Sequence, residues 1–312
     1  MTKVLITGAA GFVGRYLADY LVGGGHTVFG TDQSTRPPHP ALKDFFPSSL
    51  SDASTLRNII AETRPDVIFH LASILKAEQS ETFYTVNVLG TVTLFEAILA
   101  MGVKPKVVVT SSSAVYGAAL GARPISEGFR TRPVTHYAVS KVAQEIIALG
   151  YYKVDDIPVT IIRTFNLLGP GLSPGLACSA FSRQIALAEA GRGPRKVLTG
   201  DLRAQRDFVD VRDAVRAYVL VAFHGLAGSI YNVCSRKPVS IQDCLNILLE
   251  LSNVPVDAAR DPALVQENDV PVQVGSAARL RRLTGWMPEI ELTQSLVDLL
   301  DDWRVKVKTD SE

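Results

Sequence analysis

Cysteine is scarce in this chain, and the few cysteines present do not form a recognisable ligand set. The 312 residues include three of them, Cys178, Cys234 and Cys244, an odd number without the paired spacing of a metal site. Cysteines at such spacing are most often buried free thiols, which fits a reducing compartment. We therefore expect neither a disulfide-stapled module nor a metal centre.

An excess of charge of one sign is also missing. Lysine and arginine total 32, against 31 aspartate and glutamate residues. No net field therefore attracts nucleic acid or an anionic membrane, and any anionic ligand must be captured by local groups. We expect neither a nucleic-acid nor a membrane partner.

Targeting and membrane-spanning segments are lacking as well. The amino terminus runs directly into an apolar strand with no charged leader. No apolar run approaches the roughly 20 residues that span a bilayer. Internal repeats, low-complexity tracts and flexible linkers are absent. We expect a cytoplasmic protein, long enough to form one large α/β unit or two closely packed lobes.

Near its start the sequence does contain a glycine-rich turn, which reads TGAAGFVG. It joins a predicted strand, 3–7, to a predicted helix, 12–22. In such a turn Gly8 permits the tight bend, Gly11 lets the backbone approach a pyrophosphate, and Gly14 lets the helix pack on the sheet. The helix N-terminus also presents unpaired N–H groups to phosphates. Contacts to a dinucleotide are expected from Gly8, Gly11, Phe12, Val13 and Gly14.

A second predicted strand, 27–31, ends at Asp32. A carboxylate at this place accepts hydrogen bonds from the adenosine ribose and repels a 2′-phosphate, which favours NAD. Arg36 follows closely, and an arginine there can instead receive a 2′-phosphate. We expect NAD as the cofactor, with NADP as the alternative.

Strand and helix patterns alternate through the first half of the chain. Apolar runs at 4–7, 27–31, 67–71, 107–111 and 159–163 predict strands, with helical patterns between them. This alternation predicts a parallel, doubly wound α/β sheet with its binding crevice at the carboxyl ends of the strands. The residues expected to converge at that edge are Gly8, Asp32, Leu71, Ala72, Ser111 to Ser113 and Thr164 to Asn166.

After Asn166 the pattern loosens into loops rich in glycine and proline, which are typical of a lobe that shapes a substrate pocket. A helix is predicted over 209–222, and a strand over 229–233 that returns to the main sheet or its edge. The expected domains are a dinucleotide-binding Rossmann domain, 1–166 rejoined by 209–235, and an interwoven substrate lobe, 167–208 and 236–312.

Tyr137 and Lys141 are four residues apart in a predicted helix, so their side chains share one face. The ammonium can stabilise a phenolate. Together with the positive charge of an oxidised nicotinamide, it is expected to lower the pKa of the tyrosine toward working pH. The strand 107–111 leads into three serines whose hydroxyls can bind a substrate oxygen, although some of them instead satisfy loop backbone. This pattern indicates proton transfer beside a dinucleotide.

Motifs spread nearly from end to end make the chain resemble the extended short-chain dehydrogenase/reductases that act on nucleotide sugars. In chain order they read TGAAGFVG, HLA, NVLGT, SSSAVYG, YAVSK, RTFN, RDFVD and TGW. The resemblance implies a Rossmann-type fold, a catalytic set of Ser112, Tyr137 and Lys141, and a nicotinamide ribose held by Lys141. It also implies that Asn166 and Arg206 bind a nucleotide diphosphate, a role that suits a bidentate guanidinium.

The chain departs from the family pattern in three places. Ala114 stands where the 4,6-dehydratases carry a glutamate that abstracts the C5 proton, so dehydration is disfavoured. Ser49 stands where relatives often carry an aspartate that contacts adenine. Leu50 and Asp52 keep the rest of that pattern, and Leu50 is expected at the cofactor. Leu167 replaces a histidine often seen after RTFN in the reductases.

The later half, with RTFNLLGPG, RDFVDVRD and TGWMPEI, looks most like the GDP-4-keto-6-deoxymannose reductases. The SSSAVYG motif and Asp32 look more like the 4-epimerases that retain NAD. Both activities transfer a hydride at sugar C4. We expect reduction of a GDP-linked 4-keto-6-deoxyhexose, with 4-epimerisation of a nucleotide sugar as the alternative. A non-catalytic dinucleotide-binding regulator is disfavoured because Ser112, Tyr137 and Lys141 are all present.

The helices predicted over 91–100 and 137–149 carry apolar faces broader than one side of a sheet requires. In the family the equivalent helices form the four-helix contact of a dimer. The resemblance therefore implies a homodimer, and burial within one chain is the alternative.

Overall fold

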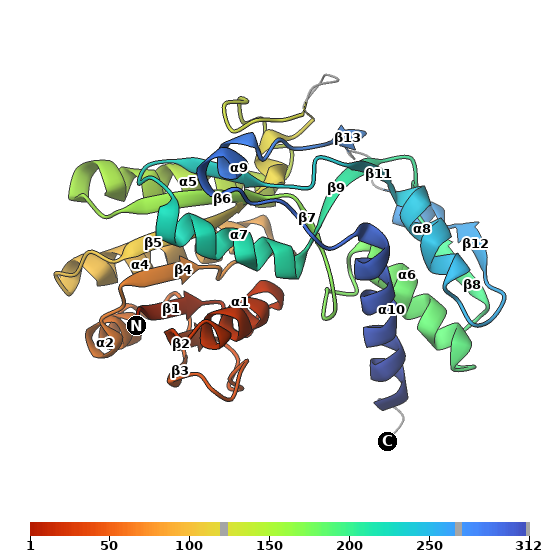
Figure 1. Ribbon diagram of the computed structural model, residues 1–312, viewed down its shortest axis with the longest axis horizontal. Coiled ribbons are helices and arrows are strands. Elements are labelled where there is room, and N and C mark those ends of the chain that lie inside the picture. The colour runs from red at the N-terminus through yellow and green to blue at the C-terminus, as the bar shows by residue number, and fades with distance from the viewer. Residues whose placement is uncertain (119–123, 266–269, 310–312) are drawn as a thin grey trace.

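A seven-stranded parallel sheet forms the centre of the larger lobe (Figure 1). The computed structural model describes residues 1–118, 124–265 and 270–309. Strand order is β10-β6-β5-β4-β1-β2-β3, with the chain reversing direction across the sheet between β1 and β4. This order confirms the predicted doubly wound α/β class. The strands are β1 (Lys3–Thr7), β2 (Thr27–Asp32), β3 (Asp44–Pro47), β4 (Val67–His70), β5 (Lys106–Ser112), β6 (Val159–Thr164) and β10 (Ile230–Val233).

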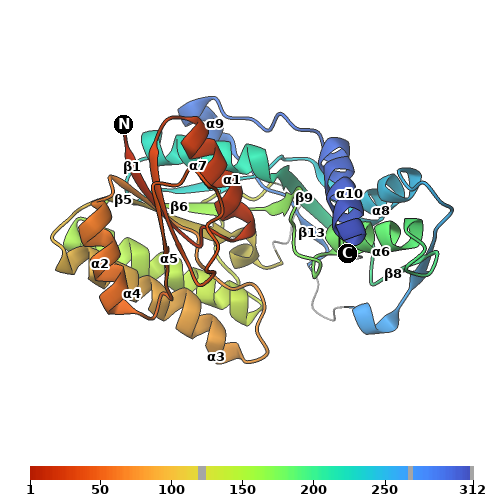
Figure 2. The same cartoon turned by 90° about the horizontal axis from the view of Figure 1, so that it is seen from below.

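Helices cover both faces of this sheet, as Figure 2 shows from below. Each face buries its own apolar cluster, which is why the central strands read as nearly unbroken apolar runs. One face carries α2 (Ala53–Thr63), α4 (Gly90–Ala100) and α5 (His136–Asp155). The other face carries α1 (Phe12–Gly23), α7 (Val211–His224) and α9 (Ala278–Thr284).

The smaller lobe holds the third apolar cluster. Its core lies between α6, α8, α10 and short strands, which Figure 1 shows beside the larger lobe. Its elements are β7 (Asn166–Leu168), α6 (Ala177–Glu189), β8 (Lys196–Thr199), β9 (Gln205–Asp210), β11 (Pro238–Ser240), α8 (Ile241–Glu250), β12 (Asp257–Arg260), β13 (Val272–Gln273) and α10 (Leu292–Thr309), with the 3₁₀ turn η3 (Pro262–Leu264). A second 3₁₀ turn, η2 (Ser113–Tyr116), follows β5 in the larger lobe.

The chain crosses between the lobes more than once. β9 lies in the small sheet, and the helix predicted over 209–222 begins only at Val211, because Val209 and Asp210 belong to that strand. The Asp210 carboxylate caps the helix by accepting a hydrogen bond from the backbone N–H of Arg212 at 2.9 Å. β10 then pairs with β6 at the edge of the large sheet, as predicted for residues 229–233.

One helical stretch, Ser80–Ala100, is long and apolar enough to cross a membrane, so the prediction that no run reaches that length is wrong for this stretch. It joins α3 (Ser80–Phe83), a π-helical segment η1 (Tyr84–Leu89) and α4 end to end. Its apolar side chains have a different explanation, since Leu94, Phe95 and Ile98 are fully buried in the core. We interpret it as a core helix.

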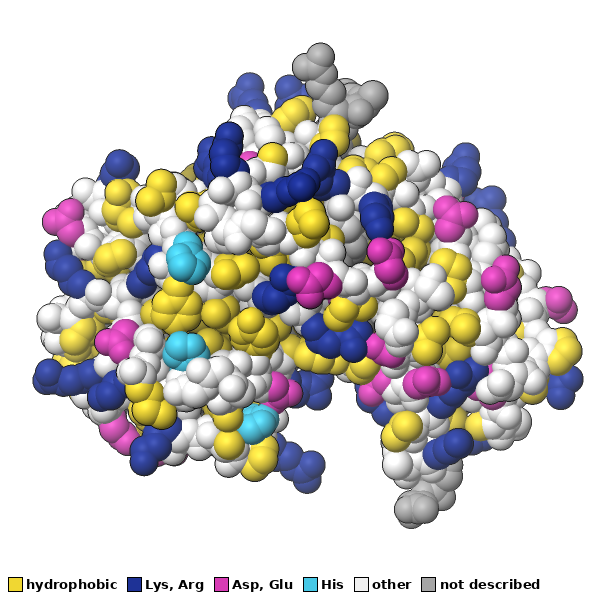
Figure 3. All heavy atoms as spheres, in the orientation of Figure 1, with side chains coloured by type: hydrophobic (Ala, Val, Ile, Leu, Met, Phe, Trp, Pro, Cys, Tyr) yellow, Lys and Arg dark blue, Asp and Glu magenta, His cyan; other side chains and the backbone are white. Residues whose placement is uncertain are grey.

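The surface charges are mixed. Figure 3 shows basic and acidic side chains interspersed over the face seen in Figure 1. All three cysteines are buried and free of disulfides, as the sequence predicts.

A buried ion pair fixes α5 against the sheet. The Arg163 guanidinium, on β6, donates two hydrogen bonds to the Glu145 carboxylate of α5, at 2.9 and 2.6 Å. Ser111 Oγ, on β5, donates a third to the same carboxylate. Both charged side chains are only 5% exposed. The orientation of α5 therefore depends on a contact that water does not compete for.

Removing the Glu145 carboxylate tests whether the fold depends on this ion pair. Glu145→Ala should lower the free energy of unfolding by about 3–5 kcal/mol, because the arginine would be left buried and unpaired. Urea denaturation followed by circular dichroism measures the change. Glu62→Ala, the same change at an exposed position of α2, is the matched control and should change stability little. Equal stability of the two variants would contradict the role of the ion pair.

Candidate active site

A large cavity of about 880 Å³ lies at the carboxyl ends of the large-sheet strands. This size suits a cofactor together with a substrate. Its wall contains all but one of the residues that the sequence predicts for the site. Those found there are Gly8, Gly11, Phe12, Val13, Gly14, Asp32, Leu50, Leu71, Ala72, Ser112, Tyr137, Lys141 and Asn166.

The glycine turn closes one end of the cavity, and its backbone packs so closely against neighbouring backbone that a side chain would not fit. Gly8 has φ +73°, and a Cβ there would lie 2.7 Å from the backbone nitrogen of Ala72. A Cβ on Gly14 would lie 2.2 Å from the carbonyl oxygen of Gly8. Gly11 is the N-cap of α1, and no side chain caps that helix. The turn thus fits a dinucleotide, whose phosphates would meet the helix N-terminus.

Asp32 lies at the end of β2 on the same wall. Its carboxylate accepts hydrogen bonds from the backbone N–H groups of Ala10, at 3.2 Å, and Ser34, at 3.0 Å. These bonds hold the carboxylate at the strand end, where an adenosine ribose would lie. Arg36 is not part of the cavity wall.

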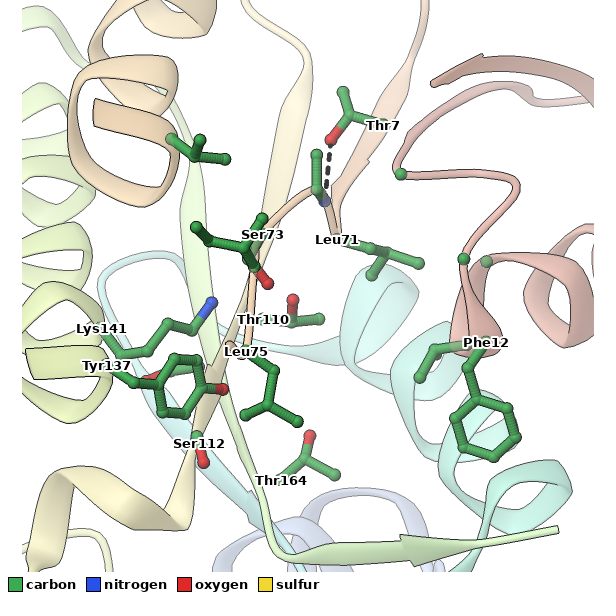
Figure 4. Close-up of a pocket in the computed structure, with 18 of the residues that line it drawn as sticks. Thr7, Phe12, Leu71, Ser73, Leu75, Thr110, Ser112, Tyr137, Lys141 and Thr164 are labelled. Atoms are coloured by element: carbon green, nitrogen blue, oxygen red, sulfur yellow. Dashed lines mark hydrogen bonds between the residues drawn. The ribbon is translucent and has the colours of Figure 1, made fainter. Parts of the chain in front are cut away.

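The other end of the cavity gathers hydroxyls and an ammonium (Figure 4). Tyr137 and Lys141 extend from α5, and Ser112 lies at the end of β5. Thr135 starts α5 by accepting a hydrogen bond from the backbone N–H of Ala138 at 3.1 Å, so Tyr137 falls in the first turn. A second contact steadies this turn, because Ser140 Oγ donates to the carbonyl oxygen of Tyr137 at 2.7 Å.

Burial dominates the pKa values of this pair. It lowers the pKa of Lys141 to about 7, an effect that nearby Glu145 opposes. It raises the pKa of Tyr137, opposed by a hydrogen bond with Ser112. The predicted lowering of the tyrosine pKa is therefore not found in the chain alone, because a buried phenolate is costly. The positive charge of an oxidised nicotinamide, which is also expected to lower the Tyr137 pKa, is a contribution of the cofactor and not of the chain.

At the same end, strands of the small lobe meet the serine turn. The Gln273 side chain, on β13, accepts a hydrogen bond from Ser113 Oγ and donates one to the Ser113 carbonyl oxygen, both at 2.9 Å. Asn166, on β7, faces the cavity nearby. Ser49, Ala114 and Leu167 also line the wall, so all three departures from the family pattern lie inside the site.

Arg206 is the predicted site residue that does not line the cavity. Its guanidinium donates to the carbonyl oxygens of Gln205, at 2.9 Å, and Val270, at 2.6 Å. β9, which carries it, pairs with both β7 and β13, so the residue lies next to the site without facing it. A motif match gives the strand position of a side chain but not its rotamer.

Sequence reasoning missed Gln273 and Gln144. Gln273 reaches Ser113 across 160 residues, and no local pattern marks such a contact. Gln144 accepts a hydrogen bond from Lys141 Nζ at 2.6 Å. The i,i+3 spacing on a predicted helix is a signal that could have indicated this second contact.

Comparisons with known proteins agree with this geometry. The sequence profile of the NAD dependent epimerase/dehydratase family matches residues 4–234. GDP-6-deoxy-D-mannose reductase of Pseudomonas aeruginosa is 34% identical over 98% of each chain. UDP-glucose 4-epimerase of Mycolicibacterium smegmatis is 30% identical over 97% of this chain and 99% of the relative. The solved structure of RMD from Pseudomonas aeruginosa complexed with NADPH superposes with a TM-score of 0.87 at 31% identity, covering 98% of this chain and 100% of the other.

Gly11→Ala tests the close approach at the glycine turn. At φ −68° alanine is allowed, and the added Cβ would touch only the Gly8 carbonyl oxygen, at 3.2 Å. The fold should survive, while the methyl group should weaken dinucleotide binding about tenfold or more, which is about 1.4 kcal/mol. NADH fluorescence titration measures the affinity. Gly23→Ala, at the open end of the same helix, is the control, and equal affinities for the two variants would exclude the proposed contact.

Proposed function

The chain belongs to the NAD dependent epimerase/dehydratase family, an NAD(P)-dependent group, and from this premise we propose that it reduces the C4 ketone of a GDP-linked 4-keto-6-deoxyhexose. The observation that carries the proposal is the cavity with a dinucleotide turn at one end and Ser112, Tyr137 and Lys141 at the other. The identity to a GDP-6-deoxy-D-mannose reductase over nearly the whole chain supports the choice of substrate.

The residues of this chain would handle the proton and the sugar oxygen. When bound, a reduced nicotinamide would supply the hydride that adds to C4. Tyr137 donates its phenolic proton to the C4 oxygen, which turns the ketone into an alcohol. Ser112 hydrogen-bonds the same oxygen and keeps it within reach of the phenol. Lys141 holds the nicotinamide ribose and stabilises the phenolate that remains until solvent reprotonates it.

We propose NADH rather than NADPH as the preferred form. The Asp32 carboxylate is held at the ribose end of the cavity by two backbone N–H groups, so it would repel a 2′-phosphate. The Pseudomonas aeruginosa structure is described as an NADPH complex, which makes this preference a point of difference to be measured.

The diphosphate site is proposed at Asn166 and Arg206. Asn166 faces the cavity, and Arg206 is carried by the adjacent strand β9. For this role the guanidinium would exchange its contact with the Val270 carbonyl oxygen for phosphate oxygens, which are the stronger acceptors.

A nucleotide-sugar 4-epimerase is the second candidate. Asp32 and the 30% identity to a UDP-glucose 4-epimerase favour it. In that reaction Tyr137 would first remove and then return the proton of the C4 hydroxyl while the keto sugar rotates between the two steps.

Incubation of the purified protein with NADH or NADPH and GDP-4-keto-6-deoxymannose tests the proposal. Loss of nicotinamide absorbance with formation of a 6-deoxyhexose, identified by NMR, is the expected result, at lower KM for NADH. Conversion of unmodified UDP- or GDP-hexoses without net use of cofactor would establish the epimerase instead. Dinucleotide binding without any turnover would favour a non-catalytic regulator.

Tyr137→Phe removes only the ionisable oxygen. NADH binding should persist, while turnover should fall by roughly a hundredfold or more, as expected for a missing general acid. The matched control is Tyr151→Phe on the same helix, whose hydroxyl donates to Glu96 away from the cavity. Near-normal turnover in Tyr137→Phe would refute the assignment.

We also propose that the protein is a cytoplasmic homodimer joined through α4 and α5. Val139 and Ile146, seven residues apart on one face of α5, are 39% and 67% exposed, and Leu89 just before α4 is 57% exposed. Ile146→Glu should therefore convert a dimer into monomers, and sedimentation velocity measures the change. An unchanged mass for Ile146→Glu, or a monomeric parent protein, would count against this interface.

A further inference from the structure

Behind the Lys141 ammonium lies a row of buried polar groups to which the proposed reaction gives no role. Lys141 Nζ donates to Gln144 Oε1 at 2.6 Å, and Gln144 Nε2 donates to Thr91 Oγ1 at 2.8 Å. His70 Nε2 lies 2.9 Å from the same Thr91 oxygen, and His70 Nδ1 lies 2.8 Å from Thr7 Oγ1. All five side chains are at most 2% exposed.

The direction of each hydrogen bond in this row follows from Thr91. Thr91 Oγ1 donates its own proton to the carbonyl oxygen of Asn87 at 2.7 Å, so it can only accept from Gln144 and His70. His70 is therefore protonated on Nε2, and its Nδ1 accepts the Thr7 hydroxyl proton. Burial and the nearby Lys141 charge lower the pKa of His70 to about 3, so the ring is neutral at physiological pH.

The Gln144 amide is consequently oriented from both sides. Its nitrogen must face Thr91, and its oxygen must face Lys141, because an ammonium only donates. The row continues to the cofactor turn, since the backbone N–H of Ala72 donates to Thr7 Oγ1 at 3.4 Å, the dashed contact in Figure 4. A continuous chain of hydrogen bonds thus links Lys141 to the end of β1, from which the glycine turn begins.

The acceptor for the ammonium is neutral, although a carboxylate is close by. Glu145 follows Gln144 on α5, but Arg163 and Ser111 already occupy its oxygens. The titratable groups that interact electrostatically with Lys141 are His70 of β4, which is neutral, and Glu145 of α5, and Tyr137 lies beside it on α5. The Lys141 charge is therefore held without being neutralised by its hydrogen-bond partner.

We propose that Gln144 is a positioning residue for Lys141. It takes one of the three ammonium protons and leaves the other two aimed at the cavity, a number that matches the two hydroxyls of a nicotinamide ribose. This inference rests on the cofactor assignment of the proposed function, and its subject is one side chain outside the cavity wall.

The pH dependence of cofactor affinity reports on this role. The pKa of Lys141, about 7 in the chain alone, marks where the ammonium loses its proton. NADH affinity should be highest below the pKa of Lys141 in the free protein, and should fall as pH rises from there through the higher pKa that bound NADH gives the ammonium. Loss of the amide acceptor lowers that pKa, because a buried ammonium without a partner is disfavoured, and a carboxylate raises it.

NADH affinity is measured by fluorescence from pH 5.5 to 9.5 for the parent protein, Gln144→Met and Gln144→Glu. Gln144→Met should bind NADH about fivefold or more weakly near neutral pH, with its midpoint moved to lower pH. Gln144→Glu should move the midpoint to higher pH by about one unit or more. Gln184→Met is the matched control, since the Gln184 amide also makes two hydrogen bonds, with the N–H and the carbonyl oxygen of Leu198, but lies in the small lobe away from the cavity.

Opposite midpoint shifts in the two variants support the proposal, whereas a role in packing alone would weaken both at every pH. Coincident midpoints, or a parent affinity that does not change with pH, would overturn it. If Gln144→Met does not fold, the upward shift in Gln144→Glu still decides the question. The measurement needs no sugar, so a protein that binds NADH but reduces no keto sugar would refute the proposed function and leave this inference standing.

Discussion

The buried ion pair between Glu145 and Arg163 is the contact on which the rest of the site depends. It joins α5 to β6, and the bond from Ser111 adds β5 to the same carboxylate. Tyr137 and Lys141 project from this helix, and Ser112 follows Ser111 on the strand. A single desolvated carboxylate thereby sets the distance between the phenol and the serine hydroxyl. Its tight pairing also explains why the neighbouring ammonium must find a neutral acceptor.

The two ends of the cavity follow different physical rules. The glycine turn can form only without side chains, since a Cβ on Gly8 or Gly14 would overlap backbone atoms. At the opposite end, polar side chains are buried and form hydrogen bonds with one another, as in the row from Lys141 through Gln144 and Thr91. The helical stretch that contains the π-helical segment η1 also lines the cavity, and its Asn87 side chain donates to Ser140 Oγ at 3.0 Å.

Much of this arrangement could be predicted from the sequence, because parallel strands bring their carboxyl ends to one edge. The alternating pattern predicted the sheet, and the motifs at Gly8, Asp32, Ser112 and Tyr137 predicted one wall of the cavity. What the sequence could not show depends on rotamers and on contacts far along the chain. Arg206 is on the expected strand but turned toward carbonyl oxygens. The sign of the Tyr137 pKa shift also required knowledge of burial, which motif spacing does not contain.

The reciprocal contact between Ser113 and Gln273 has a consequence for how the protein is made. The serine turn is translated early, whereas its glutamine partner emerges 160 residues later, on a strand that pairs with β9 of the small lobe. A nascent chain can form the glycine turn and six strands of the parallel sheet first, because β1 to β6 precede the small lobe in the sequence, whereas the edge strand β10 follows later. The end of the cavity that holds Ser112, Tyr137 and Lys141 is completed only when synthesis is nearly finished. An incomplete chain would therefore be able to hold a dinucleotide before it could use one.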